Sequence, residues 1–354
     1  MRVAVLPDWR KSNPYQRLLA EALEAQGVEC FFPQGYRRGL PISRALLPKP
    51  RPDVLHLHWP TPYLRDPRLF WRGLYSARTI ADLAIVRVAG IPIVWTVHNL
   101  ITHDAKAPKI EWWFSRRLAR QVDRLIVHSE AARDAVVEEL GVAPEKTSVI
   151  PHGPLADAYG AAPDRNEARD ALGLPRDVPV ALFFGMIRPY KGVPELLRAW
   201  DALGDRRGDA VLRIVGSALD PQYAAQIADL AAEIPSVQVD LRFVPDEEVP
   251  VQMAAADLLV LPFAQSLTSG SVHLAQDYGL PVLASRLPGT AGLPNVTYVD
   301  GTAPDVLGKG IMAALSSEAT RSSTMGTIPW PSIAELHKEV FSSMLSSSNQ
   351  TELT

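Results

Sequence analysis

Short runs of aliphatic and β-branched residues alternate with amphipathic stretches along most of the chain. The runs of the first half lie at 3–6, 54–58, 91–97, 125–127 and 148–150, and those of the second half at 179–185, 211–215, 238–243, 257–261 and 281–284. Such alternation is typical of βαβ units and of a parallel sheet covered by helices on both faces. The pattern therefore predicts two doubly wound α/β halves of similar size.

Residues 151–179 are rich in Ala, Asp, Gly and Pro and show no sustained strand pattern, so we expect the connection between the halves there. A length of 354 residues fits two ordinary domains. We place the first domain at 1–160 and the second at 161–330. Ser332 can cap a helix over 331–346, which carries apolar residues at helical spacing, and residues 347–354 are expected to be a frayed tail.

The N-terminus and the cysteine content point to an ordinary intracellular protein. The first apolar run ends at Pro7 and Asp8, too early for a signal peptide or a membrane-spanning helix, so we expect a cytoplasmic protein. Cys30 is the single cysteine and lies within the apolar stretch 28–32. That context favours a buried structural thiol over a reactive one.

Charge is distributed unevenly between the halves. Residues 1–150 contain 22 Lys and Arg against 15 Asp and Glu, whereas residues 151–354 contain 14 against 24. In the basic half, Lys106, Lys109, Arg116, Arg117 and Arg120 surround the aromatic run 112–114. Cations interleaved with aromatic rings suit an anionic membrane surface, but a solvated helix face with a few core aromatics explains them equally well. No nucleic-acid motif accompanies the basic residues, so we expect no nucleic-acid partner.

Two cations follow the first strand of the second half. Arg188 and Lys191 stand on a turn flanked by Gly185 and Gly192. Fixed positive charge at a strand end can stabilise a diphosphate leaving group as negative charge develops on it. A surface turn with solvated cations has the same pattern, so the turn alone leaves both interpretations open.

A run of small hydroxyl residues leads from the strand at 257–261 into the next helix. Thr268, Ser269, Gly270 and Ser271 would stand at the helix N-terminus, where free N–H groups and the helix dipole favour an anion. Capping requires only one hydroxyl. We therefore expect this run to bind the same diphosphate as Arg188 and Lys191.

In order and spacing, four segments of the second half resemble the nucleotide-sugar domain of family 4 and related GT-B glycosyltransferases. The segments are 188–192, 244–248, 256–262 and 278–282. The resemblance implies a GT-B fold, with two Rossmann-like doubly wound domains facing a central cleft. The domain at 1–160 is then expected to bind the acceptor and the domain at 161–330 the nucleotide sugar, and the helix at 331–346 is expected to return to the first domain. It also implies that Arg188 and Lys191 bind the diphosphate of a nucleotide sugar, and that the segment at Phe243 and Val244 holds the base or ribose.

The chain departs from that family at two glutamates that lie eight positions apart in its retaining members. The corresponding positions hold Ser266 and Leu274. The run 267–271 instead resembles bacterial exopolysaccharide β-mannosyltransferase-type enzymes, which act on lipid carriers. This likeness favours GDP-mannose as donor, a glycan or lipid-linked acceptor and inversion, with Ser266 as a candidate contact to donor sugar or acceptor.

Candidate residues of the first half also follow predicted strands. His98 resembles the histidine beside the donor sugar in family 4 enzymes, and Asn13 and His58 are candidate contacts to the sugar or the acceptor. An inverting transfer needs a base at the acceptor hydroxyl, for which Asp104 on the loop after His98 is our first candidate and His98 the second. A role for Asp104 as the cap of the next helix stays open.

We expect no metal site, because the chain has no Asp-x-Asp pair and the histidines lack ligand spacing. No cofactor is expected beyond the nucleotide-sugar substrate. Three alternatives stay open: a retaining family 4-type transferase that uses another UDP- or GDP-sugar, an inactive GT-B scaffold that binds sugar nucleotides or a partner, and a sugar-nucleotide epimerase.

Overall fold

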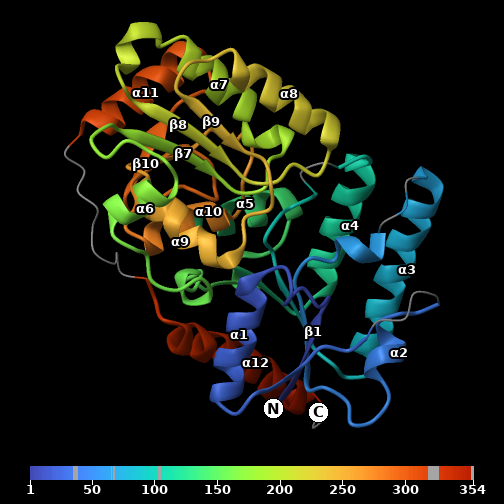
Figure 1. The fold of residues 1–354 in the computed structure, drawn as a ribbon. Helices are drawn as coiled ribbons and strands as arrows, with labels where there is room; N and C mark the ends of the chain where they lie inside the picture. Colours follow the sequence, from blue (N-terminus) through green and yellow to red (C-terminus); the bar gives the residue numbers. More distant parts are fainter. Residues whose placement is uncertain (35–38, 65, 67, 103–104, 318–326, 352–354) are drawn as a thin grey trace. The chain divides into compact units, whose positions relative to one another are not determined.

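The chain forms two compact α/β units in a computed structural model that describes residues 1–34, 39–64, 66, 68–102, 105–317 and 327–351 (Figure 1). One unit comprises Met1–Gly153 and Ile328–Thr354, and the other comprises Pro154–Thr327. The chain thus passes into the second unit before residues 160–161, where we placed the boundary. Part of the expected connection belongs to the second unit.

The first unit is built on a six-stranded parallel sheet of order β2-β1-β3-β4-β5-β6. Its strands are β1 (Arg2–Leu6), β2 (Glu29–Phe31), β3 (Val54–Leu57), β4 (Ile93–Thr96), β5 (Arg124–Val127) and β6 (Thr147–Val149). Its helices are α1 (Pro14–Ala25), α2 (Ser43–Leu46), α3 (Leu69–Val88), α4 (Pro108–Gln121), α5 (Glu130–Leu140) and α12 (Trp330–Thr351). Strands β3 and β4 are buried at every position, as expected for a parallel sheet covered on both faces.

The second unit repeats this plan with a parallel sheet of order β12-β11-β10-β7-β8-β9. Its strands are β7 (Val180–Phe184), β8 (Val211–Val215), β9 (Val237–Asp240), β10 (Leu258–Leu261), β11 (Val282–Ser285) and β12 (Val296–Val299). Its helices are α6 (Arg165–Ala171), α7 (Val193–Asp201), α8 (Pro221–Ala232), α9 (Val249–Ala255), α10 (Gly270–Asp277) and α11 (Pro304–Ser316). Two doubly wound halves are confirmed.

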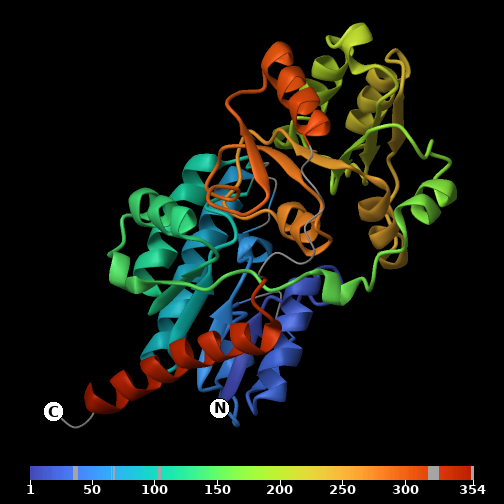
Figure 2. The same ribbon diagram turned by 90° about the vertical axis from the view of Figure 1, so that its left-hand side faces the viewer.

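The C-terminal helix α12 belongs to the first unit and packs against α1 (Figure 2). It begins at Trp330 rather than after a Ser332 cap, and it continues to Thr351, past the expected end at 346. A Cβ atom at Gly153 would overlap the indole of Trp330. The close approach of the Gly153 backbone to this ring therefore fixes the start of α12 beside the end of the first sheet.

The segment before β7 is tied to the second unit by a buried arginine. The Arg169 side chain is completely buried and donates to the carbonyl oxygens of Ala255, Pro175 and Val178 and to the Asp257 carboxylate. Helix α6, which carries Arg169, packs against α9. The stretch 151–179, where we expected the connection between the halves, therefore also contains a short helix that polar contacts hold to the second unit.

Candidate active site

The Arg188–Lys191 turn lies at the carboxyl end of β7 and needs glycines on both sides. Gly192 adopts φ +71°, and a Cβ atom there would overlap the carbonyl oxygen of Pro262 after β10. Gly185 adopts φ +123°, and a Cβ atom there would lie 2.9 Å from Ser271 Oγ and 3.3 Å from Lys191 Nζ. The glycines therefore allow the turn to approach the start of α10.

Lys191 lies in a cationic environment. Among the described residues no carboxylate lies within salt-bridge distance of its Nζ, which stands 5.1 Å from the centre of the Phe263 ring. Burial, with the nearby Arg188 guanidinium as a second cause, lowers the pKa of Lys191 to about 8. Two neighbouring cations held at one strand end create a site that a bound anion would stabilise.

Helix α10 begins beside this turn. Ser269 caps the helix by accepting a hydrogen bond from the Val272 N–H, and Ser271 Oγ donates to the Phe184 carbonyl at the end of β7. Thr268 Oγ1 is buried and has no hydrogen-bond partner among the described residues. The structure therefore brings Lys191 and the hydroxyl run together. Ser269 also caps the helix, a role that a serine at the start of any helix can have.

The segment at Phe243 and Val244 follows β9 on the same edge of the sheet. The Phe243 ring is 73% exposed, whereas Val244 is buried. Within the described part of the chain, neither residue makes a backbone hydrogen bond. An exposed ring beside available backbone groups is chemically suited to a planar base, but nothing in the structure assigns it that role.

The two positions that hold glutamates in retaining family 4 enzymes are buried. Leu274 contributes to the core of the second unit on α10. The Ser266 carbonyl accepts the Gly289 N–H, and a Cβ atom at Gly289 would overlap Ser266 Oγ. Neither position can supply a carboxylate, and the close approach of Gly289 leaves little room for a longer side chain at 266.

In the first unit, six of the eight histidines of the chain gather around Tyr15. The rings of His98, His128 and His152 have centres 5.2, 5.3 and 4.7 Å from that of Tyr15, and His58 lies 6.0 Å away. The His56 ring lies tilted against that of His58 with ring centres 4.2 Å apart, and His337 of α12 lies 5.7 Å from His56. We call His56, His58, His98, His128, His152 and His337 the histidine cluster.

Five of the six rings in the cluster are buried, His152 is half-buried, and the hydrogen bonds of the buried rings are specific. His58 Nδ1 and His98 Nε2 share a hydrogen bond of 3.2 Å, and the Trp59 indole stacks on His98 with ring centres 4.0 Å apart. His56 Nε2 bonds to Thr96 Oγ1 at 2.7 Å, and His128 Nδ1 donates to the Ile150 carbonyl. These contacts fix the rings in place at the ends of the central strands.

Burial also keeps these imidazoles neutral. It is the main cause that holds the pKa values of His56, His58 and His98 well below the usual range, with neighbouring histidines as the second cause. The pKa values of His128 and His337 fall to about 4, again through burial. His98 is thus a neutral imidazole at neutral pH, able to accept a proton or a hydrogen bond.

Sequence reasoning found His58 and His98 but missed the cluster as a whole. The signal was present, because His58, His98, His128 and His152 follow four successive strands, β3 to β6. Carboxyl ends of neighbouring parallel strands share one edge of the sheet, so residues there come together. His337 carried no such signal, since only the return of α12 brings it to His56.

The structure describes Asn13 and Cys30 among the remaining residues that the sequence singled out, but not Asp104. Asn13 caps α1, accepting a hydrogen bond from the Tyr15 N–H at 3.0 Å, so its side chain is engaged in a structural contact. Asp104 lies outside the described residues. Cys30 is half-buried, and burial raises the pKa of its thiol to about 12, which makes it unreactive.

Two further properties concern metals and membranes. Within the described ranges, no set of three His, Cys, Asp or Glu side chains has a geometry that could hold a metal ion, the histidine cluster included. No helix in that same part of the chain is long and apolar enough to cross a bilayer.

Comparison with known proteins matches both halves of the chain. Residues 5–154 match the model of Glycosyltransferase Family 4, and residues 178–316 match that of Glycosyl transferases group 1. A GDP-mannose:glycolipid 4-beta-D-mannosyltransferase of Xanthomonas campestris pv. campestris is 29% identical over 347 residues, covering 93% of this chain and 88% of its own. A D-inositol 3-phosphate glycosyltransferase of Streptomyces scabiei is 32% identical over 310 residues, covering 82% of this chain and 63% of its own.

Solved structures agree on the fold. Sucrose-phosphate synthase from Thermosynechococcus elongatus superposes with a TM-score of 0.73 at 16% identity, over 98% of this chain and 99% of that one. Anabaena HepE, in complex with UDP and glucose, superposes with a TM-score of 0.72 at 18% identity, over 97% and 99%. The two sheets, the two family models and these neighbours together identify the chain as a GT-B glycosyltransferase, a hexosyltransferase of the family 4 and group 1 type.

Proposed function

We propose that this enzyme transfers mannose from GDP-mannose to a lipid-linked saccharide, without a metal ion and with inversion at the anomeric carbon. The relative named for GDP-mannose and a glycolipid acceptor aligns with 93% of this chain, which supports the donor and the acceptor class. The observation that carries the catalytic proposal is the grouping of Lys191, Gly185 and Ser271 at the carboxyl end of β7.

In the proposed reaction, the acceptor oxygen forms a bond to the anomeric carbon while the bond from that carbon to the GDP oxygen breaks. The acceptor hydroxyl proton passes to a base, and the electron pair of the broken bond leaves on the diphosphate. Arg188, Lys191 and the N–H groups at the start of α10 stabilise this charge, as preorganised donors do at other developing anions.

For the base, we propose Asp104, with His98 as the alternative. The neutral state of His98 fits a hydrogen-bond acceptor for a sugar hydroxyl, and its lowered pKa makes it a weaker base than an ordinary imidazole, which places it second. Asp104→Asn should lower turnover by about two to four orders of magnitude and leave donor binding nearly unchanged. Full activity in that variant would transfer the role to His98 or to another group.

The donor is tested by thermal shift with a panel of nucleotide sugars, because a ligand at 100 times its Kd adds about 2.7 kcal/mol of stability. We expect GDP-mannose to give the largest shift, and UDP-sugars to give little. Turnover should persist in EDTA. Loss of activity that only a divalent ion restores would contradict the metal-independent mechanism.

The stereochemical course is tested by the anomeric coupling constants of the product. A β-linked mannoside from the α-configured donor supports inversion, whereas an α-linked product supports the retaining alternative. Binding of GDP-mannose with no transfer to any saccharide acceptor would instead support the inactive scaffold.

We further propose that the face formed by α3 and α4 rests on an anionic membrane. Both helices carry exposed apolar side chains: Leu69, Phe70, Trp71 and Leu74 on α3, and Trp113 on α4. The acidic residues of these two helices, Asp82 and Glu111, are buried, so every exposed charge on them is positive. This combination fits a surface that carries anionic lipids and the lipid-linked acceptor.

A further inference from the structure

His58 and His98 follow neighbouring strands, β3 and β4, and are joined by a hydrogen bond. Nδ1 of His58 lies 3.2 Å from Nε2 of His98. Burial holds the pKa values of both rings well below the usual range, so both imidazoles are neutral at neutral pH. In a pair of neutral imidazoles, one ring donates an N–H group and the other accepts with a lone pair. The direction of this bond therefore fixes which nitrogen of each ring carries the proton.

The other ring nitrogen of His58 decides that direction. His58 Nε2 is buried and has no hydrogen-bond partner among the described residues. If His58 accepted the bond, its own proton would stand on Nε2 as a buried N–H group without an acceptor, whereas donation leaves only a lone pair unpaired. Buried N–H groups without an acceptor are rarer in proteins than unpaired acceptors. His58 therefore donates through Nδ1, and His98 accepts at Nε2 and carries its own proton on Nδ1.

The surroundings hold both rings in this arrangement. The His58 N–H donates to the Leu6 carbonyl at 2.9 Å, and the His58 carbonyl accepts the indole N–H of Trp95 at 2.9 Å. The Trp59 indole lies 14° from parallel to the His98 ring, with ring centres 4.0 Å apart. The backbone of His58 and the plane of His98 are therefore both fixed, which gives the shared hydrogen bond one geometry.

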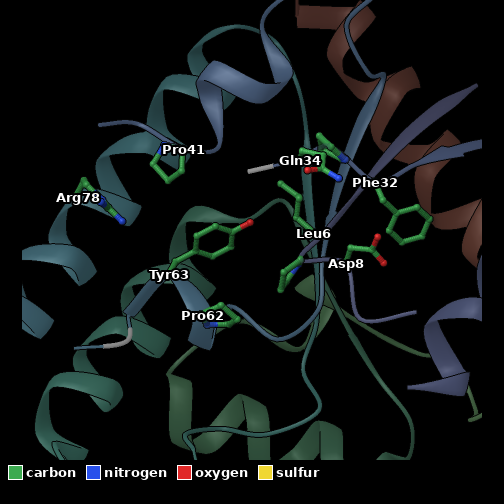
Figure 3. A pocket seen from close by; sticks show the side chains of 10 residues that line it. Leu6, Asp8, Phe32, Gln34, Pro41, Pro62, Tyr63 and Arg78 are labelled. Carbon is green, nitrogen blue, oxygen red and sulfur yellow. The ribbon is translucent and has the colours of Figure 1, made fainter. Parts of the chain in front are cut away.

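His58 is placed to act through His98 and not on a ligand. A cavity of about 500 Å³ lies beside Leu6, Asp8 and Arg78 (Figure 3), and His58 is not among the described residues that line it. The cavity that His58 does border has a volume of about 120 Å³, well below the roughly 300 Å³ at which ligand pockets begin. His98 is the more exposed ring, at 6% against 1% for His58. A ligand therefore meets His98 and not His58.

We propose that His58 is a positioning residue: its Nδ1–H group holds His98 in the tautomer whose own Nδ1–H donates to a hydroxyl oxygen of the donor sugar. The inference rests on the proposed function, since it assigns a contact to the sugar that is transferred. Neutrality alone would let His98 accept a hydrogen bond from a sugar hydroxyl, but the bond to His58 makes Nδ1 of His98 a donor. In this tautomer Nδ1 has no lone pair for the acceptor proton, which leaves Asp104 as the proposed base.

The first test reads the tautomers from the nitrogen NMR chemical shifts of the imidazole rings in the full chain, because protonated and bare ring nitrogens resonate far apart. Single-residue variants assign the signals. We expect the proton of His98 on Nδ1, although free histidine favours Nε2. In His58→Leu, which removes the donor, the proton of His98 should move to Nε2. A wild-type His98 that carries its proton on Nε2 would overturn the proposal.

The second test compares the affinities for GDP-mannose and GDP by titration calorimetry, because their ratio isolates the contribution of the sugar. His58→Leu should lower the affinity for GDP-mannose by about tenfold, through the loss of one hydrogen bond, and leave that for GDP unchanged. His58→Asn, whose side-chain N–H can stand where the Nδ1–H group stands in the wild type, should restore most of the loss. An unaltered ratio in folded His58→Leu would overturn the proposal, and the melting temperature of the variant shows whether it is folded.

His337→Gln is the matched control for packing, because His337 is a buried ring of the same cluster whose Nδ1 bonds to the Ile333 carbonyl. It should leave both affinities as they are. A loss in His337→Gln equal to that in His58→Leu would mean that the pair only stabilises the fold, which contradicts the proposal. If His58→Leu does not fold, the tautomer of wild-type His98 decides the question alone.

The proposed function has a separate readout, which is the affinity for GDP-mannose. Normal binding of GDP-mannose, together with a proton on Nε2 of His98, means that this inference fails and the proposed function stands. The expected tautomers without binding of GDP or GDP-mannose mean that the proposed donor is wrong, while His58 still sets the tautomer of His98.

Discussion

Among individual residues, Lys191 has the most specific proposed role. Lys191→Ala or Arg188→Ala should cost about 2–4 kcal/mol of transition-state stabilisation, comparable with the loss of one preorganised oxyanion donor. Lys309→Ala, which removes an exposed lysine from α11 of the same unit, is the matched control and should retain wild-type kcat/KM. Near-normal turnover in both site variants would remove the diphosphate assignment.

The lowered pKa of Lys191 gives a second, independent prediction. Because its pKa is about 8 in the free protein, Lys191 is charged below pH 8 and loses its proton as the pH rises above it. GDP affinity should therefore be constant below pH 8 and fall by up to about tenfold per pH unit above it. Calorimetry in buffers of different ionisation enthalpy would detect proton uptake on binding at pH 8.5.

Lys191→Arg is the matching variant for this pH dependence. An arginine stays charged throughout the range, so the decline in GDP affinity above pH 8 should disappear even if the absolute affinity changes. A decline that persists unchanged would assign the titration to another group.

At the scale of elements, Gly153 controls the return of α12. Gly153→Ala would push a methyl group into the Trp330 indole and should destabilise the first unit by about 1–3 kcal/mol, the usual cost of overpacking. Gly73→Ala on α3, where a Cβ atom meets nothing within 4 Å, should be neutral or slightly stabilising. Urea unfolding of both variants measures the difference, and equal stability of the two would contradict the steric argument.

Helices α3 and α4 should determine membrane binding. The wild-type protein should sediment with anionic vesicles at low salt and be released as salt rises, because exposed cations attract the surface and salt screens them. Phe70→Ser combined with Trp113→Ser should reduce sedimentation, because both rings are exposed to solvent. The exposed fraction is 75% for Phe70 and 48% for Trp113. Leu219→Ser, at a residue 65% exposed on the second unit, should have no effect.

Equal and negligible sedimentation of the wild-type protein with anionic and neutral vesicles would contradict the membrane proposal. The proposed transfer reaction would still stand. The acceptor would then reach the enzyme without contact between these helices and the bilayer.

At the scale of the molecule, the histidine cluster should make the first unit sensitive to acid. The pKa values of His128 and His337 are about 4 in the fold and about 6.5 when unfolded. A lowered folded pKa means that the contribution to stability is complete above pH 6.5 and is lost as the pH falls towards 4. By linkage, each of the two would remove about 2 kcal/mol by pH 5.

Tryptophan fluorescence is the suitable measurement, because seven of the eight tryptophans lie in the first unit. The midpoint of urea unfolding should fall steeply from pH 7 to pH 5. His337→Gln should flatten that slope, and His273→Gln, on α10 of the second unit, should leave it as it is. A midpoint that does not change over this range would show that the cluster is hydrated or already charged in the fold.

The sequence alone determined the two doubly wound halves and the position of the turn from Arg188 to Lys191. Most residues of the central strands are apolar, and the turn at Arg188 closely follows β7, so local pattern was sufficient. Strands β2 and β12 were missed because they are short, lie at sheet edges and are partly exposed, so burial imposes no continuous apolar run on them.

Tertiary structure alone decided how side chains from distant segments meet. Tyr15 reaches His152 and Trp330, and Arg78 of α3 lines the same cavity as Asp8 after β1, although nothing in the sequence between these residues relates them. Local propensity selects each helix and strand, whereas the packing of the helices onto an open sheet decides which side chains from different elements come into contact. Contacts across such distances in sequence depend on that packing, which therefore decided that His337 joins the histidines at the strand ends and that Arg78 and Asp8 line one cavity.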